Sequence, residues 1–142
     1  MTIQDEAESW NDKIIENFRA NRGHVTMPPF VGASLLLLTA RGARTGLRRT
    51  LPLGYTRDGG RFVVIGSNSG KPDHPAWLHN IAADPKVTLE VGEETFEARA
   101  SITQGPERQR LFDAMAATIS AFAEYQRKTP RELPVVTLER QA

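Results

Sequence analysis

The distribution of apolar residues predicts one helix near the N-terminus, followed by a series of short strands. Trp10, Ile14 and Phe18 recur at the spacing of a single helical face. Four consecutive leucines indicate a strand over 34–40 that is buried on both faces. Further strands are predicted over 50–57, 61–67, 86–91, 95–103 and 134–139.

Turns and further helices complete this pattern. Asp58-Gly59-Gly60 and Gly92-Glu93-Glu94 are typical of tight hairpin turns between neighbouring strands. A short helix is predicted to end near residue 82, and a longer one opens at Pro106 and continues or restarts as far as Tyr125. About six mostly antiparallel strands, with N-terminal, middle and C-terminal helices, predict an α+β fold with a barrel-like sheet. The glycine spacings of dinucleotide-binding and Walker A loops are absent from the sequence.

The length of 142 residues predicts one domain over 9–142, preceded by a flexible tail over 1–8. Ser9 is the predicted cap of the first helix, and Gly23 is its predicted stop. The absence of cysteine excludes disulfides, thiolate nucleophiles, iron–sulfur clusters and cysteine-ligated zinc. The longest apolar run is too short to span a bilayer, so we expect a cytoplasmic protein. The apolar face of the first helix leaves peripheral contact with a membrane open.

Positive charge is concentrated between the first two predicted strands, where four arginines fall within 41–49, although the net charge of the chain is only +1. Guanidinium groups bind phosphate and carboxylate in a planar, bidentate manner. Arg44 and Arg49 could therefore cradle an anion, with Thr45 and Gly46 adding a hydroxyl and backbone N–H groups. The alternative is a solvated loop whose arginines pair with surface carboxylates. Nucleic acid is a disfavoured partner, because the charge is confined and lacks interleaved aromatic residues.

A second candidate region comprises the polar loop 66–71 and the short helix that follows it. Such a loop, placed after a strand and before a helix, can admit a polar or anionic ligand. Trp77 could cover a flat conjugated ring, although packing in the core is the more common role of such a residue. His74 and His79 lack the H-E-x-x-H spacing, so no metal site is predicted.

Tyr125 is the remaining candidate for chemistry. Its phenol could donate a hydrogen bond or a proton to a bound acceptor, or it could simply anchor the end of a helix. No catalytic triad, carboxylate pair or cysteine–histidine couple is present in the sequence. If the chain is an enzyme, a cofactor must therefore supply the reactive group.

An ordered set of motifs extends over about residues 10–139. They are Leu35-Leu-Leu-Leu-Thr39, Arg44-Thr-Gly-x-x-Arg49-x-x-Pro-Leu53, the Asp58-Gly-Gly turn, Ser67, Pro75-x-Trp77-x-x-Asn80, Asp84-Pro85-x-Val87, and Tyr125-Gln126 followed by Pro134-Val-Val. In this order the chain resembles the deazaflavin-dependent nitroreductases, a branch of the split β-barrel flavin-binding superfamily. This branch uses coenzyme F420 instead of FMN.

The resemblance implies a split β-barrel that binds coenzyme F420, an 8-hydroxy-5-deazaflavin with a phosphodiester and a polyglutamate tail. By this resemblance Arg44, Thr45 and Arg49 hold the phosphate and the tail. Residues 65–68 would lie along the deazaflavin, and residues of the short helix would close over it. The matching positions that make up the remaining coenzyme contacts are Gly46, Pro52, Ile65, Gly66, Ser67, Asn68, Ala76, Trp77 and Asn80.

The resemblance also implies an activity. Reduced coenzyme F420 would pass a hydride from C5 to a planar, electron-poor acceptor such as a quinone, a nitroaromatic or a coumarin-type lactone. Tyr125 or solvent would complete the protonation, which makes Tyr125 the candidate catalytic residue. Ile119 and Phe122 stand where related enzymes carry further tyrosines, and this more apolar pocket favours a quinone. Asn68 replaces a residue that is commonly basic in the family.

Three points remain open at the level of the sequence. The same barrel could bind a deazaflavin or another anionic ligand without turnover, or it could be an FMN-dependent oxidoreductase of the wider superfamily. The chain could be a monomer or a homodimer. In each case the expected partner is a small, planar molecule.

Overall fold

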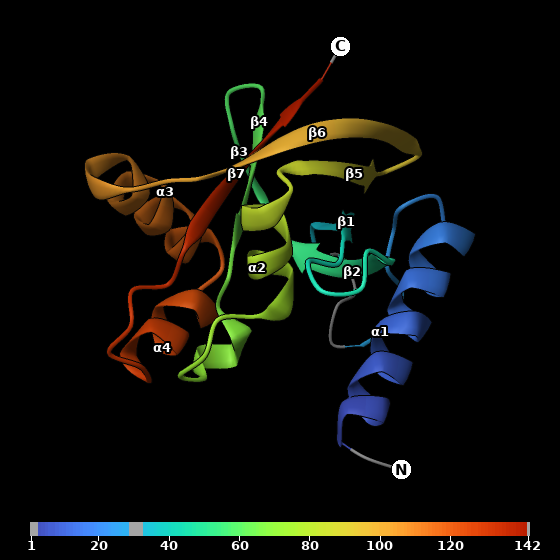
Figure 1. Ribbon diagram of the computed structural model, residues 1–142, viewed down its shortest axis with the longest axis horizontal. Coiled ribbons are helices and arrows are strands. Elements are labelled where there is room, and N and C mark those ends of the chain that lie inside the picture. The colour runs from blue at the N-terminus through green and yellow to red at the C-terminus, as the bar shows by residue number, and fades with distance from the viewer. Residues whose placement is uncertain (1–2, 29–32, 142) are drawn as a thin grey trace.

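The computed structural model describes residues 3–28 and 33–141 of the chain (Figure 1). In chain order the elements are α1 (Ile3–Ala20), β1 (Leu35–Arg41), β2 (Arg48–Gly54), β3 (Thr56–Asp58), β4 (Arg61–Ile65), the 3₁₀ helix η1 (Asn68–Gly70), α2 (Ala76–Ala83), β5 (Lys86–Val91), β6 (Glu94–Ile102), α3 (Gly105–Thr118), α4 (Ala121–Arg127) and β7 (Val135–Arg140).

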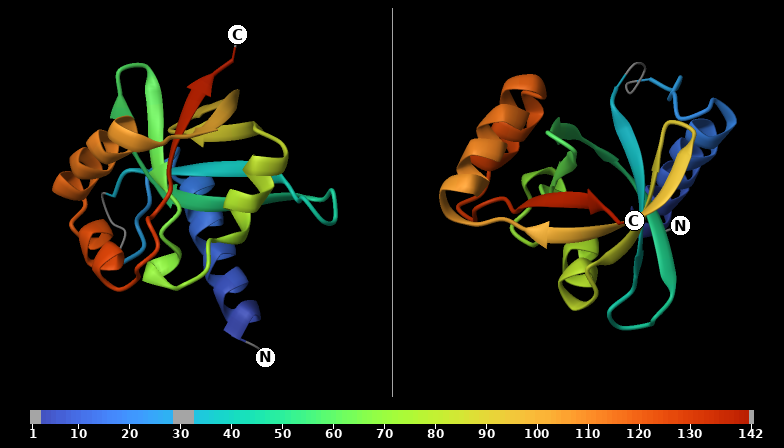
Figure 2. Two further views of the ribbon diagram at one scale, coloured as in Figure 1. Left: turned by 60° about the vertical axis from the view of Figure 1, so that its left-hand side comes forward. Right: turned by 90° about the horizontal axis from the view of Figure 1, so that it is seen from above.

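Within the described residues, seven strands form one antiparallel sheet in the order β2-β1-β5-β6-β7-β4-β3. β2 and β3 lie at opposite ends of this order, yet only Tyr55 separates them along the chain. The sheet must therefore curl until its two edges approach each other, as the view from above shows (Figure 2). The predicted α+β split barrel is confirmed. The predicted strand over 50–57 is corrected to two strands, β2 and β3, because the chain passes from one edge of the sheet to the other at Tyr55.

The leucines of β1 are buried on both faces of the sheet, as their sequence pattern predicts. Leu36 and Leu38 face a core that includes Leu78 of α2. Leu37 faces the opposite way and packs with Phe18 of α1. Each such side chain contributes about 1.5–3 kcal/mol through its burial. β1 therefore fixes both α1 and α2 relative to the sheet.

A separate apolar cluster holds α3 and α4 against β4 and β7. Ile65 and Val135 from the sheet pack with Met115 of α3, and Tyr125 of α4 covers the edge of this cluster. The helix that opens near Pro106 restarts rather than continues, because Ile119 adopts an extended backbone conformation (φ −124°, ψ 93°) between α3 and α4.

The first helix is longer than the sequence suggests. It begins at Ile3 and not after a cap at Ser9, so residues 3–8 belong to α1. Residues 1–2 of the predicted tail lie outside the described part of the chain, and the division into a flexible tail and one domain stays a prediction. Every helix of the described residues is too short or too polar to cross a lipid bilayer.

Candidate functional site

The turn between β1 and β2 is closed by its own backbone. The N–H of Gly42 donates to the carbonyl oxygen of Leu47 over 2.8 Å, and the N–H of Gly46 donates to the carbonyl oxygen of Gly42 over 2.9 Å. Gly46 has φ 73°, a left-handed conformation that disfavours any residue with a Cβ. The turn projects beyond the sheet (Figure 2), and residues 43–49 are exposed.

The arginines of this region are exposed and differ in their partners. Neither Arg44 nor Arg49 makes a side-chain hydrogen bond or ion pair with any residue that the structure describes. The neighbouring Arg48 differs, since its Nη2 donates to Thr88 Oγ1 over 2.8 Å. The described residues therefore do not provide the carboxylate partners that the solvated-loop alternative requires.

Asn80 of α2 connects the turn to the rest of the site. Its Oδ1 accepts a hydrogen bond of 3.0 Å from the backbone N–H of Ala43. The amide nitrogen of the same side chain can still donate to a ligand. Between the turn and α2 lies a cavity of about 850 Å³. Its lining residues are Gly42, Ala43, Arg44, Thr45, Arg49, His74, Ala76, His79 and Asn80.

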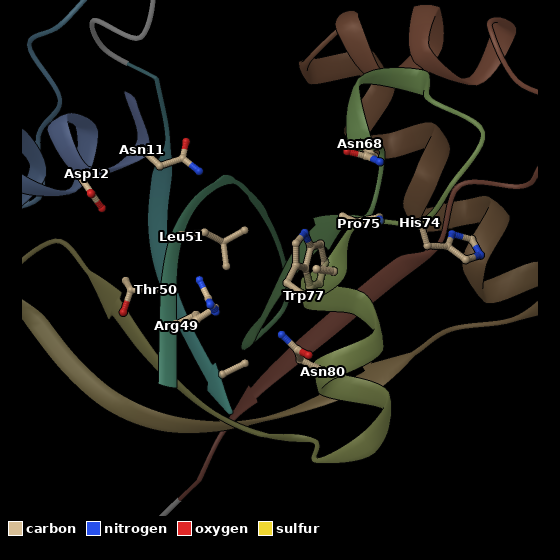
Figure 3. Close-up of a pocket in the computed structure, with 12 residues that line it drawn as sticks. Asn11, Asp12, Arg49, Thr50, Leu51, Asn68, His74, Pro75, Trp77 and Asn80 are labelled. Atoms are coloured by element: carbon tan, nitrogen blue, oxygen red, sulfur yellow. The ribbon is translucent and has the colours of Figure 1, made fainter. Parts of the chain in front are cut away.

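A second cavity of about 580 Å³ adjoins the first and shares four lining residues with it, Arg49, His74, Ala76 and Asn80. In Figure 3 the side chains of Arg49 and Leu51 extend from one wall towards Trp77 on the other. α1 contributes Asn11 and Asp12 to this cavity, which sequence reasoning missed. The remaining lining residues are Ala40, Thr50, Asn68, His74 and Pro75.

Trp77 belongs to the core and also lines a cavity, so its core role is observed, and its role over a flat ring stays a prediction. The side chain is only 7% exposed and belongs to the core beneath the sheet. It also lines the second cavity. A tryptophan fixed by core packing presents a rigid, flat wall to a planar ligand, at little further entropy cost on binding.

The loop before α2 has an unusual backbone. Asn68, Ser69 and Gly70 have φ values of 47°, 56° and 76°, three left-handed residues in succession. For the two residues with side chains this conformation costs about 1–3 kcal/mol each, so contacts with the surroundings must stabilise it. Asn68 Nδ2 donates to the carbonyl oxygen of Asp73 over 3.0 Å, which closes the loop on itself.

Tyr125 lines a third, more apolar cavity of about 460 Å³. Phe122 and Ile119 line it with Tyr125, and the rings of Phe122 and Tyr125 meet edge to face at 6.2 Å. Tyr55, the residue between β2 and β3, adds a second phenol that sequence reasoning did not place here. In the sequence, Tyr55 stands out only as a residue next to a strand. The curl of the sheet is what places it at the same cavity as residues of α4.

The structure gathers most, but not all, of the predicted site residues. Arg44, Thr45, Arg49, Asn68, Ala76, Trp77 and Asn80 line the two adjoining cavities. Gly46, Pro52, Ile65, Gly66 and Ser67 line neither of them, and Ile65 is buried in the cluster beneath α3. Any contact of residues 65–67 with a ligand would thus come from the backbone.

Arg131 supports the loop 66–71 beside the site, and sequence reasoning missed it entirely. It lies between α4 and β7, and its guanidinium donates to the carbonyl oxygens of Gly66 (3.3 Å), Ser67 (2.8 Å) and Lys71 (2.9 Å). No periodicity or turn chemistry links position 131 to these residues, which are more than fifty positions earlier in the chain.

The donor set suits an anionic, planar redox cofactor. Two guanidinium groups that pair with no other described residue offer sites to phosphate and carboxylate, and the adjoining cavity has a flat indole wall. Coenzyme F420 has this division between an acidic tail and a flat ring, so the residues present fit it. A curled antiparallel sheet with such a cleft is a split β-barrel, and its donor set fits a redox cofactor with an acidic tail.

The chain belongs to the F420H(2)-dependent quinone reductase family, whose sequence model matches residues 10–140. It is 37% identical over 108 residues to the F420H(2)-dependent quinone reductase Rv1261c of Mycobacterium tuberculosis, with 74% of this chain and 72% of that protein covered. The solved F420-H2 dependent reductase FDR-A is 32% identical, with a TM-score of 0.69 over 75% of this chain and 94% of the other. Another solved structure, described as a domain-swapped dimer, is 28% identical, with a TM-score of 0.71 over 97% of this chain and all (100%) of the other.

The family confirms three predictions made from the sequence: the resemblance to deazaflavin-dependent reductases, coenzyme F420 as the cofactor, and an F420-dependent reductase as the class of enzyme. A small-molecule acceptor follows from this class. The roles of the individual site residues stay predictions.

Proposed function

We propose that this reductase delivers a hydride from reduced coenzyme F420 to a flat, hydrophobic quinone. The observation that carries the proposal is that Arg44 and Arg49, which pair with no other described residue, lie at two adjoining cavities, one of which is walled by Trp77. The names of the relatives, F420H(2)-dependent quinone reductases, support the choice of acceptor.

Arg44, Thr45 and Arg49 hold the phosphodiester and acidic tail in this proposal. Charge-assisted hydrogen bonds to an anion are about twice as strong as neutral ones, so two guanidinium groups give a large share of the affinity. The N–H of Gly46 already donates to Gly42, so Gly46 contributes through the shape of the turn and not as a free donor. Pro52 would act in a similar way, by stiffening β2.

The deazaflavin lies along Trp77 and Ala76 in this arrangement. Asn80 keeps its Nδ2 free for the coenzyme while its Oδ1 holds the arginine turn. Asn68 donates one N–H of its Nδ2 to the carbonyl oxygen of Asp73, which leaves its other N–H and its Oδ1 for a ligand. The backbone of Ile65, Gly66 and Ser67 supplies any further hydrogen bonds, as their side chains line neither cavity.

The acceptor occupies the cavity beside Tyr125. When bound in its reduced form, coenzyme F420 supplies a hydride. A quinone that accepts this hydride also needs one proton to become a hydroquinone, and the phenol of Tyr125 or a water molecule provides it. Ile119 and Phe122 make this cavity mostly apolar, which favours a quinone over a more polar nitroaromatic. Nitroaromatics and activated alkenes are the secondary acceptors to test.

Turnover and coenzyme affinity test the proposal together. We expect the purified protein to oxidise reduced coenzyme F420 in the presence of menadione, and to leave NADH and NADPH unchanged. Arg49→Ala should raise the Kd for coenzyme F420 by about one to two powers of ten, or about 1.5–3 kcal/mol, because a charge-assisted contact is lost.

The matched control is Arg127→Ala, since Arg127 is exposed on α4 and lines none of the three cavities. An unchanged Kd in Arg49→Ala would contradict the tail site. Tight coenzyme binding without single-turnover oxidation by menadione would instead indicate a binding protein, and preferential binding of FMN would indicate a flavin enzyme.

Tyr125→Phe tests the proton donor separately. We expect kcat with menadione to fall by about tenfold or more, while the Kd for coenzyme F420 stays the same, because only the phenolic hydrogen is removed. Steady-state kinetics at saturating coenzyme give both values. An unchanged kcat would assign the proton to solvent and leave Tyr125 as part of the wall.

A further inference from the structure

Arg131 uses all three of its guanidinium nitrogens on one loop. Its Nε donates to the carbonyl oxygen of Lys71, its Nη2 to that of Ser67, and its Nη1 to that of Gly66. Nη1 also lies 2.9 Å from Nδ1 of His74. The side chain is half-buried, and no carboxylate of the described residues forms an ion pair with it.

These carbonyl groups flank the strained left-handed run of Asn68, Ser69 and Gly70. A strained backbone persists only where its surroundings over-determine it. Arg131 holds the loop on both sides of the run, and the run itself packs on α4. A Cβ added at Gly70 would lie 2.9 Å from the carbonyl oxygen of Tyr125, so loop and helix are in close contact there.

This contact joins the two halves of the site. Asn68 lines the cavity that contains Trp77, and Tyr125 lines the apolar cavity. Asn68 is the first residue of η1, and η1 packs on α4, which carries Tyr125. A shift of the loop would therefore change the distance between a ligand in one cavity and a ligand in the other.

His74 is kept neutral in this arrangement. Its pKa is lowered, chiefly by burial and then by the positive charges of Arg131 and His79, against a smaller opposing effect of Asp73. With Arg131 donating to Nδ1, the ring proton must be on Nε2, because a nitrogen that accepts a hydrogen bond carries no hydrogen.

We propose that Arg131 is a positioning residue of the reductase. It fixes the loop 66–74 so that the coenzyme beside Asn68 and the acceptor beside Tyr125 are held at a distance suited to hydride transfer. This inference rests on the proposed assignment of the two cavities to coenzyme and acceptor. Arg131 contacts neither molecule; it acts through the backbone of the loop.

Lysine cannot replace arginine in this role. The planar guanidinium donates in three fixed directions, whereas an ammonium is a compact charge on a flexible stem. Arg131→Lys thus keeps the charge and loses the geometry. Arg127→Lys is the matched control, because Arg127 comes from the neighbouring helix, is exposed and lines none of the three cavities.

The kinetic test compares Arg131→Lys with this control at a temperature well below the Tm of each. We expect kcat with menadione at saturating coenzyme to fall by about tenfold or more, with a change in coenzyme Kd of only about threefold or less, because misplacement affects the transfer step first. Arg49→Ala should give the opposite pattern, a raised Kd with kcat retained. A kcat in Arg131→Lys equal to that of Arg127→Lys would overturn the proposal, since charge alone would then suffice.

NMR of the imidazole rings provides a test that does not depend on turnover. The chain has three histidines, so their ring nitrogen signals can be assigned by substitution. We expect neutral His74 of the wild type to carry its proton on Nε2, and its titration midpoint to rise in Arg131→Gln. A proton on Nδ1 in the wild type would overturn the contact with Arg131. Failure of the wild type to turn over would reject the proposed function, while this measurement would still report on Arg131.

Discussion

The side chain of Asp58 connects two elements that are far apart in the sequence, the β3–β4 hairpin and α3. From the sequence it is a residue of a hairpin turn, but its carboxylate also accepts hydrogen bonds from two arginines. Arg61 Nη2 donates to Oδ2, and Arg110 of α3 donates to Oδ1 over 3.0 Å and to Oδ2 over 3.2 Å. The hydrogen bonds from Arg110 and then Arg61 lower the pKa of Asp58 from 3.8 to about 2. The carboxylate therefore ties the β3–β4 hairpin to α3.

Asp58→Asn should reduce stability at neutral pH and much less in acid. A folded-state pKa below the unfolded value means that the ionised carboxylate stabilises the fold above pH 3.8, and that this contribution is lost as the pH falls towards about 2. Urea unfolding of both proteins across this range measures the difference in free energy of unfolding. A difference that stays constant down to pH 2 would contradict the role of the ionised form.

The residues of the site differ in how far the sequence reveals them. Arg44, Thr45 and Arg49 could be predicted because charge and glycine occur together within one turn. Arg131 could not, because its partners are backbone carbonyl groups, which carry no sequence signal. The same holds for the hydrogen bond between Asn80 and the backbone of Ala43.

At the level of elements, η1 packs so closely on α4 that only glycine fits at position 70. Gly70 is buried, has φ 76° and faces the backbone of Tyr125. Gly92, in the turn between β5 and β6, also has a positive φ of 58°, but a Cβ there would meet nothing within 4 Å. The two glycines thus share a conformation and differ in their surroundings.

Gly70→Ala should therefore destabilise the protein more than Gly92→Ala. Both substitutions incur about 1–2 kcal/mol for an alanine in a left-handed conformation. Only the first also forces α4 away from the loop, which adds about 1–3 kcal/mol for overpacking. Thermal and urea unfolding of the two variants measure the difference. Equal losses would show that α4 yields without cost at this point.

Element boundaries were predicted well where apolar periodicity decides them and less well elsewhere. β1 and its double burial follow from four adjacent leucines. The split between β2 and β3 does not, because Thr50 to Arg57 alternates like one continuous strand. The start of α1 at Ile3 was missed because Ser9 is a good cap that the helix passes through.

At the level of the whole molecule, the sheet order itself could not be worked out from hairpins alone. Hairpins account for β1–β2, β3–β4 and β5–β6, but the pairs β1–β5, β6–β7 and β4–β7 join distant segments. The family resemblance implied a split β-barrel, and such a barrel requires long-range strand pairs of this kind. Whether the chain is a monomer or a homodimer stays a prediction, as does its cellular compartment.

The position of β7 has a consequence for how the protein folds during synthesis. The last strand along the chain inserts between β6 and β4, in the interior of the sheet. Until residues 135–140 have left the ribosome, the earlier strands can pair only as two separate sheets, β2-β1-β5-β6 and β4-β3. Arg131 also emerges late. The single seven-stranded sheet can therefore form only after residues 135–140 have left the ribosome.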